Sequence, residues 1–437
     1  MLSDPLPACP PDESPVPSPN PAPERSAEPL PGRSPEGAIR FIVDLARALH
    51  RYGTTAHRLE NALQGVAHRL GLEAQFFSTP TAVFLSAGLP GEEAKTVLIR
   101  VQPEAMNLER LALLDGLATE VMRGEVSVEV AAERIAAINT APQRYGRALA
   151  LASSAVASAT AARFFGGGWR EVLAGGLLGL MVGLLGRYSG PRPWLGRLFE
   201  PMAAALASFL ATFAAAHGGR ISVYIVTLSA LITLVPGLSL TVAMSELSTR
   251  DLSSGSARLA NALMIFLALA FGVAFGAQLA ALLIAGAPAA GLVHPIPLPA
   301  WTEWIALAVA PLGFVVLLRA SPRDIPWILI AGVTAYFGVR LGARALGPQL
   351  GAFAGAVAVG AGSNLYARFL DRPAAVTQVP GILFLVPGSI GFKSLAALLE
   401  SDVVSGIETA FRMTLVAIAL VAGLLVSNVV VPPRKAL

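Results

Sequence analysis

The residues LVPG occupy positions 234–237 of this 437-residue chain and recur at positions 385–388. In the same register and without a gap, DLSSG at 251–255 is matched by DVVSG at 402–406. Seven identities at one offset of 151 residues are more than the biased composition explains. They indicate an internal duplication, in which two related halves follow one another along the chain.

Charge is distributed unevenly around this repeat. Charged residues make up 14% of the chain and apolar residues 54%, whereas a soluble domain carries about 25% charge. Residues 36–147 hold 25 charges in 112 positions, and residues 148–437 hold 28 in 290. The first segment is therefore expected to be soluble and the second to lie in a membrane.

The segment before the repeat divides into a tail and a domain. Residues 1–35 contain 12 prolines and no apolar core of a signal peptide, so we expect a disordered tail. Residues 36–147 alternate helix and strand patterns, with β-rich runs at 74–78, 82–87 and 96–101. They predict a compact cytoplasmic α/β domain.

Apolar runs of helix length follow in quick succession, and a spanning helix needs about 20 such residues. The ten predicted spans begin near Ala148, Glu171, Met202, Ile221, Ser256, Trp301, Ile325, Gln349, Ala375 and Val403. Five spans fall in a first membrane repeat at 148–290 and five in a second at 299–431. Because an odd number reverses the orientation of the second copy, the expected fold is a polytopic α-helical membrane protein with a 5+5 inverted repeat.

The basic residues of the short loops predict the orientation. With the α/β domain inside, 13 arginines and lysines fall on the cytoplasmic side and six on the far side. Cytoplasmic loops carry such an excess. We therefore expect a multi-pass protein of the cell (inner) membrane with both termini in the cytoplasm.

Each Pro-Gly pair of the repeat lies within or at the end of an apolar run. Proline removes a backbone donor and glycine tolerates the bend, so both helices are expected to break there. In lipid, such a break persists where protein or a watery cavity satisfies the freed carbonyls. Two related breaks suggest a shared cavity near the middle of the membrane, and a simple kink in each helix is the alternative.

Polar and ionisable residues gather beside the breaks, and charges within spans usually face a pathway or a partner. Glu246, three helical turns past the first break, is suited to hold a substrate ammonium or a coupling proton. Asp251 and Asp402 are either functional or helix caps, and Arg258 either counters these charges or marks the membrane edge. The predicted substrate and coupling residues are Pro236, Gly237, Ser239, Thr241, Glu246, Asp251, Arg258, Pro387, Gly388, Ser389 and Asp402.

The α/β domain offers one weak candidate for chemistry. His57 and Glu60 stand one helical turn apart, where they could form a catalytic or metal-binding pair. No third ligand has zinc spacing, no nucleophile or phosphate-loop motif occurs, and the single cysteine excludes a cysteine cluster. We expect no metal and no cofactor, and a contact or regulatory surface is the favoured interpretation. The scattered basic residues and a net charge of +4 do not suggest nucleic acid.

These motifs resemble the threonine/serine exporter family. The resemblance lies in GTTAHRLE at 53–60, in Thr79-Pro80-Thr81, and in VPG at 235–237 with acidic residues ten and fifteen positions beyond the proline. LVPGS at 385–389 resembles the family's second membrane module, which is here fused to the first. The resemblance covers residues 36–430. In one departure, this chain has Glu246 and Val242 where the family pattern has aspartate and asparagine.

The resemblance implies export of threonine and serine from the cytoplasm, driven by the proton gradient. The residues themselves predict a secondary transporter that works by alternating access, with a small amino acid, protons and the lipid bilayer as its partners. A membrane-anchored hydrolase and a passive channel are the alternatives. The sequence leaves the oligomeric state open, a homo-oligomer included.

Overall fold

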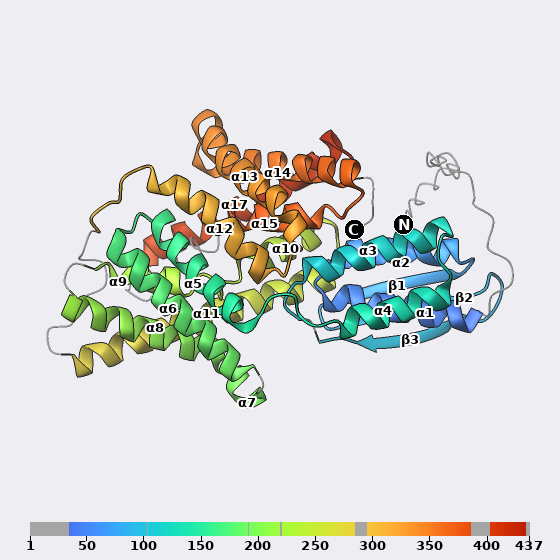
Figure 1. The fold of residues 1–437 in the computed structure, drawn as a ribbon, viewed down its shortest axis with the longest axis horizontal. Helices are drawn as coiled ribbons and strands as arrows, with labels where there is room; N and C mark the ends of the chain where they lie inside the picture. The colour runs from blue at the N-terminus through green and yellow to red at the C-terminus, as the bar shows by residue number, and fades with distance from the viewer. Residues whose placement is uncertain are drawn as a thin grey trace, which may run out of the picture.

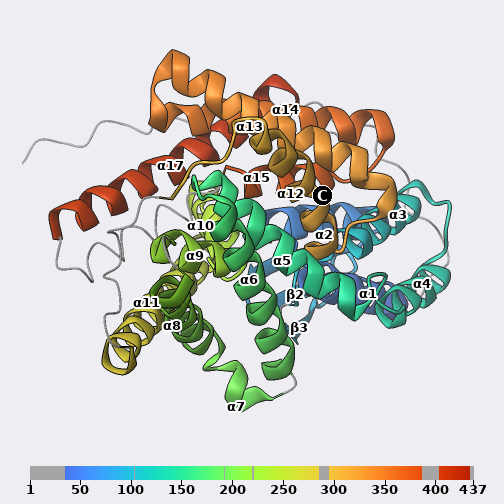
Figure 2. The ribbon, with the colours of Figure 1, turned by 60° about the vertical axis from the view of Figure 1, so that its left-hand side comes forward.

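The computed structural model describes residues 35–102, 104–190, 192–218, 221–284, 295–385 and 403–433. The chain forms an N-terminal α/β unit and a larger body of helices, which lie side by side (Figures 1 and 2). The predicted tail at 1–35 falls almost wholly outside the described residues, as do Pro387, Gly388, Ser389 and Asp402.

The N-terminal unit combines four helices with a small sheet, and its first two helices pack against the sheet. The order is α1 (Pro35–Arg51), α2 (Ala56–Arg69), β1 (Glu73–Thr79), β2 (Ala82–Gly88), β3 (Lys95–Arg100), α3 (Leu108–Arg123) and α4 (Val128–Thr140). The strands pair antiparallel in the order β1-β2-β3. Each strand lies within one residue of the run that period-two alternation predicts.

The core of this unit lies between the helices and one face of the sheet. Phe41, Leu45, Leu63 and Leu85 are fully buried there or nearly so. Gly71 ends α2 with a φ of +72°, a left-handed conformation that costs glycine little. This turn lets β1 follow α2 directly and pack against it.

The helical body begins with α5 (Arg147–Phe164), α6 (Trp169–Ser189), α7 (Pro193–Gly196) and α8 (Phe199–Gly218). It continues with α9 (Val223–Ala230), α10 (Gly237–Ser248), α11 (Leu252–Leu283) and α12 (Thr302–Leu317). A 3₁₀ turn, η1 (Pro322–Asp324), precedes α13 (Ile325–Leu346), α14 (Pro348–Leu370), α15 (Ala375–Leu383) and α17 (Val403–Val430).

Six of these helices are long and apolar enough to cross a membrane: α6, α8, α11, α13 with its 3₁₀ turn, α14 and α17. Within the described residues, the other predicted spans correspond to α5, α9 with α10, α12 and α15, which do not meet that standard. The physical reason is clearest at α9 and α10, where one apolar run is divided into helices of 8 and 12 residues.

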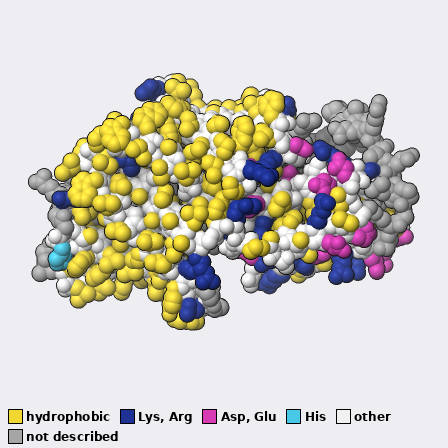
Figure 3. All heavy atoms as spheres, in the orientation of Figure 1, with side chains coloured by type: hydrophobic (Ala, Val, Ile, Leu, Met, Phe, Trp, Pro, Cys, Tyr) yellow, Lys and Arg dark blue, Asp and Glu magenta, His cyan; other side chains and the backbone are white. Residues whose placement is uncertain are grey.

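The outer surface of the body is apolar. Leu177, Phe271 and Leu282 are each at least 66% exposed, which a water-soluble surface avoids. Figure 3 shows hydrophobic side chains over most of the visible face of the body, whereas charged side chains gather over the N-terminal unit and its border with the body. Together with the six long helices, this surface defines a multi-pass membrane protein.

Helix bounds in the second half follow those of the first at nearly the repeat offset. From α8 to α14 the first residue advances by 149, from α9 to α15 by 152, and from α11 to α17 by 151. The two halves join where α12 packs against α5, and where α10 packs against α15 and α17.

Glycines allow neighbouring helices to approach closely. A Cβ placed on Gly276 of α11 would lie 2.1 Å from the carbonyl oxygen of Ala205 on α8, and one on Gly272 would lie 2.3 Å from that of Pro201. Neither methyl group fits without moving backbone, so α8 and α11 pack through these positions.

Candidate substrate and coupling site

The predicted break at the first Pro-Gly pair is present in the structure. Helix α9 ends at Ala230, residues 231–236 form turns, and α10 begins at Gly237 with Pro236 as its N-cap residue. Both Pro236 and Gly237 are buried. In the second half α15 ends at Leu383, two residues before the second LVPG run, most of which lies outside the described residues.

Glu246 lies in the last turn of α10 and is 2% exposed. Arg258 of α11 donates from Nε to its two carboxylate oxygens, at 3.2 Å to Oε1 and 3.0 Å to Oε2. The tight turn between the helices makes this possible, because Arg250 is left-handed with φ +68° and the Asp251 N–H donates to the Glu246 carbonyl at 2.8 Å. Of the two roles proposed for Arg258, the structure favours the countercharge.

The same carboxylate caps a helix of the N-terminal unit. The backbone N–H of Ala56, the first residue of α2, donates to Glu246 Oε1 at 3.1 Å. A helix N-terminus carries a partial positive charge, worth up to about 2 kcal/mol to an anion in a partly buried geometry. Glu246 thus lies between a guanidinium of the helical body and the positive end of α2.

A second contact of α2 reaches the other half of the body. Arg58 donates from Nη2 to Gln378 Oε1 of α15 at 2.6 Å, and burial lowers the pKa of this arginine. The first turn of α2 therefore donates hydrogen bonds to one residue from each half, Glu246 and Gln378. The predicted site omitted Arg58 and Gln378. A signal for Gln378 was present in the sequence, because a glutamine within an apolar run needs a hydrogen-bond partner.

The other predicted residues have more local roles. Thr241 is buried and donates from Oγ1 to the Gly237 carbonyl at 3.1 Å, while Ser239 is half-buried on the same helix. Asp251 is the N-cap residue of α11, but its carboxylate accepts from Thr249 Oγ1 at 2.8 Å instead of from the α11 backbone. Asp251 therefore has the position of a helix cap without its hydrogen bond.

His57 and Glu60 have different hydrogen-bond partners. The Glu60 carboxylate accepts from the Ser78 N–H at 2.6 Å and ties α2 to β1, whereas His57 is exposed beside Asn61. Burial raises the pKa of Glu60, and the negative charges of Asp251 and Glu246 add to that rise. Among the described residues no group of three His, Cys, Asp or Glu side chains is placed to hold a metal ion.

A buried histidine completes the contact region. His50 Nε2 lies 2.7 Å from the Thr79 carbonyl, and its Nδ1 has no hydrogen-bond partner in the described part of the chain. Burial lowers the pKa of His50, and the charge of Arg258 lowers it further. The hydroxyl groups of Thr54 and Ser254 are also buried without a partner among the described residues.

A broken apolar helix and an ion pair inside a helical membrane body are features that membrane transporters show. The comparisons with known sequences identify the family: the threonine/serine exporter model matches residues 40–280, and a second model, "Threonine/Serine exporter, ThrE", matches residues 303–430. The chain belongs to this family, with both of its modules in one polypeptide.

Related proteins occur in fungi. The chain is 26% identical over 397 residues to an uncharacterized protein of Schizosaccharomyces pombe, covering 87% of this chain and 46% of the relative. It is 27% identical over 384 residues to "Pheromone-regulated membrane protein 10" of Candida albicans, covering 86% of this chain and 34% of the relative. It thus spans half or less of the length of these relatives. No solved structure matches.

Proposed function

We propose that this protein is a secondary transporter that exports small hydroxylated amino acids, threonine and serine, in exchange for protons. The observation that carries the proposal is the ion pair of Glu246 and Arg258, in which Glu246 is buried at the end of the helix that begins at the Pro236 break and accepts from the first residue of α2. In this proposal the protein lies in the inner membrane of the cell. Residues 36–147 form a domain in the cytoplasm, and both termini lie on the same side.

The charge pattern of this pair complements an amino-acid zwitterion. The ammonium group of a substrate would replace Arg258 beside the Glu246 carboxylate, and its carboxylate would take the Arg258 guanidinium, whose planar fork matches that shape. The hydroxyl groups of Ser239 and Thr241 lie on the same helix as Glu246 and provide acceptors for a hydroxylated side chain. Asp251 adds a second negative charge nearby.

Proton exchange follows from the same carboxylate. A proton and a substrate ammonium compete for Glu246, so protonation from the outside releases the amino acid and a cytoplasmic amino acid displaces the proton. Protonation also weakens the hydrogen bond to the Ala56 N–H, because a neutral acid is a poorer acceptor at a helix N-terminus. We infer that α2 leaves the pair when the cytoplasmic side opens.

Alternating access requires two parts that rock against each other around the site. The recurrence of helix bounds near 151 residues and the split into 148–290 and 299–431 support an inverted repeat. The first turn of α2 bonds to both halves, at Glu246 and Gln378, and so would hold them in one relative position. We extend the proposed set of substrate and coupling residues to Pro387, Gly388, Ser389 and Asp402 of the second half.

Radiolabelled threonine or serine flux in proteoliposomes tests the proposal, with and without an imposed proton gradient. We expect gradient-driven flux in the natural protein, loss of that flux in Glu246→Gln, and recovery of part of it in Glu246→Asp, which keeps the charge. Glu408→Gln is the matched control, since Glu408 is exposed and, within the described residues, pairs with Arg412 one turn away. Flux that ignores both the gradient and Glu246 would indicate a passive channel and refute the proposal.

A further inference from the structure

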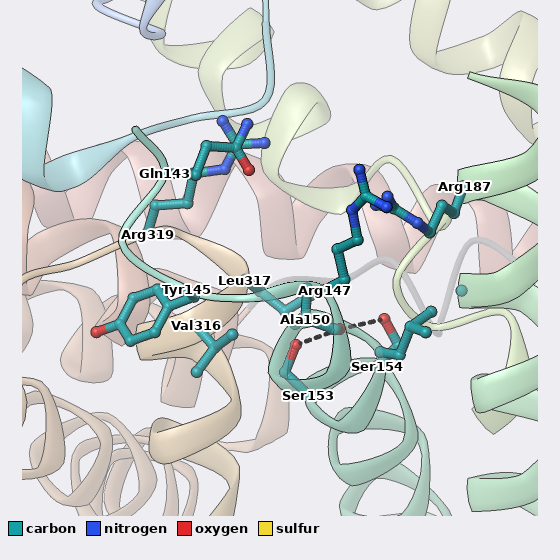
Figure 4. A pocket seen from close by; sticks show the side chains of 12 residues that line it. Gln143, Tyr145, Arg147, Ala150, Ser153, Ser154, Arg187, Val316, Leu317 and Arg319 are labelled. Carbon is teal, nitrogen blue, oxygen red and sulfur yellow. Dashed lines mark hydrogen bonds between the residues drawn. The ribbon is translucent and has the colours of Figure 1, made fainter. Parts of the chain in front are cut away.

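A pocket of about 240 Å³ lies away from Glu246, at the ends of three helices of the body. Its walls bring together Arg147, the first residue of α5; Arg187, in the last turn of α6; and Arg319, which follows α12. Figure 4 shows the three guanidinium groups on one side of the pocket. None of the 12 lining residues is acidic. We call this site the arginine pocket.

The positive charge of the arginine pocket is uncompensated in the described part of the chain. The ion pairs found there involve none of Arg147, Arg187 and Arg319. The positive end of α5 adds to the field, whereas the negative ends of α6 and α12 offset part of it without forming an ion pair. Three like charges held around one cavity repel one another, and an anion bound between them relieves that repulsion.

The free donors of the pocket are its guanidinium groups and the side-chain amide of Gln143. Ser153 and Ser154 donate to the Ala150 carbonyl, at 2.7 and 3.4 Å, and Tyr145 donates to the Ala320 carbonyl at 2.6 Å. These hydroxyl hydrogens are occupied, so an incoming ligand accepts from the three arginines and from Gln143, and the arginines supply the charged donors. Guanidinium groups bind the oxygens of phosphate by paired, charge-assisted hydrogen bonds.

The fold holds the third arginine in place. Arg319 is left-handed, with φ +50°, and its carbonyl accepts the Glu109 N–H of α3 at 3.2 Å. The adjacent Leu108 N–H donates to the Leu318 carbonyl at 3.0 Å. The pocket is therefore formed where the N-terminal unit meets the helical body, and its backbone is fixed by that contact.

Apolar surface adjoins the arginines on the same helices. Leu151, one turn after Arg147, is half-buried and lines the pocket, and Leu184, three residues before Arg187, is 49% exposed. A ligand with an anionic head and an apolar tail would contact both surfaces. Basic residues at the ends of membrane helices lie at the level of the lipid headgroups, where such a ligand is present.

We propose that the arginine pocket binds a phosphate group, carried by the headgroup of an anionic phospholipid. The bound lipid offsets part of the positive charge of the pocket and joins α5, α6 and α12 to the N-terminal unit. The site is separate from Glu246 and does not depend on which solute is transported.

The test uses the full-length protein in a neutral detergent, with lipid binding measured by native mass spectrometry and thermal stabilisation. The ligands are phosphatidylglycerol, phosphatidylcholine and inorganic phosphate. The pocket variant is Arg147→Gln with Arg187→Gln. Its control is Arg197→Gln with Arg323→Gln, which removes the same charge from exposed arginines outside the pocket lining.

We expect phosphatidylglycerol to bind more tightly than phosphatidylcholine, and the pocket variant to bind it roughly tenfold more weakly. The control should keep the natural affinity within about twofold on the same reasoning. Inorganic phosphate that competes with the lipid would identify the free anion as an alternative carrier of the same group. Equal binding of the two lipids, or equal losses in both variants, would overturn the proposal.

Discussion

The ion pair between Glu246 and Arg258 allows a quantitative test by a double-mutant cycle. Glu246 is 2% exposed, and the Arg258 side chain is 25% exposed. Removing one partner of a buried pair costs about 3–5 kcal/mol, because the other charge stays buried without compensation. Arg258 retains some contact with solvent, so we expect Glu246→Gln to lower the free energy of unfolding by about 3 kcal/mol, the low end of that range.

The geometry explains this cost. Both carboxylate oxygens accept from Arg258 Nε, and Oε1 also accepts from the Ala56 N–H. A glutamine side chain can replace one oxygen, but its amide NH₂ then faces a donor of Arg258. In the double variant with Arg258→Gln, two amides can bond to each other, so part of the loss is recovered.

The assay is the free energy of unfolding in mixed detergent micelles, measured for both single variants and the double variant. We expect a coupling energy of about 2 kcal/mol between the two positions. Costs that add to within about 0.5 kcal/mol would refute the reasoning, because independent sites behave in that way.

Three further predictions concern packing, docking and pH. Gly276→Ala should lower the thermal midpoint markedly in detergent, because its methyl group meets the Ala205 carbonyl of α8. Arg58→Gln should speed amide hydrogen exchange in the first turn of α2, since its bond to α15 is lost. The pKa of His50 is lower in the folded protein than in the unfolded chain, so the unfolded chain binds the proton first as the pH falls. His50 should therefore lower the free energy of unfolding below pH 6.5, by at most about 1.4 kcal/mol per pH unit. The thermal midpoint of His50→Gln should lack this contribution.

Each of these predictions has a control. Gly362→Ala adds the same methyl group where nothing lies within 4 Å, and it should leave the midpoint unchanged or raise it. Arg47→Gln removes an exposed charge from α1 and should not alter exchange in α2. For His50, the thermal midpoints of the variant and the natural protein are compared between pH 7.5 and 5.5. Above pH 6.5 the imidazole is neutral in the folded and unfolded states, so the two proteins should differ only below it. An equal fall of both midpoints with acid would contradict the assigned role.

Local rules made most secondary structure predictable. The three strands, the helices of the N-terminal unit and the break at Pro236 follow from periodicity, turn residues and the missing N–H of proline. Glu246 was predictable as well, because a carboxylate beside a break in an apolar run needs a partner. The number of membrane-spanning helices was less predictable. A break divides one apolar run into two helices, and each is then shorter than the roughly 20 residues that cross a membrane.

The sequence by itself determined the composition of the two parts, the repeated motif, the broken helix and the position of a carboxylate three turns past the break. Tertiary structure alone decided which groups meet that carboxylate. Nothing within the spacing of residues 53–60 indicates that Ala56 and Arg58 reach positions 190 and 320 residues away. The same holds for the arginine pocket, whose three arginines come from three separate helix ends. Such contacts depend on how whole helices pack, and local periodicity carries no information about that packing.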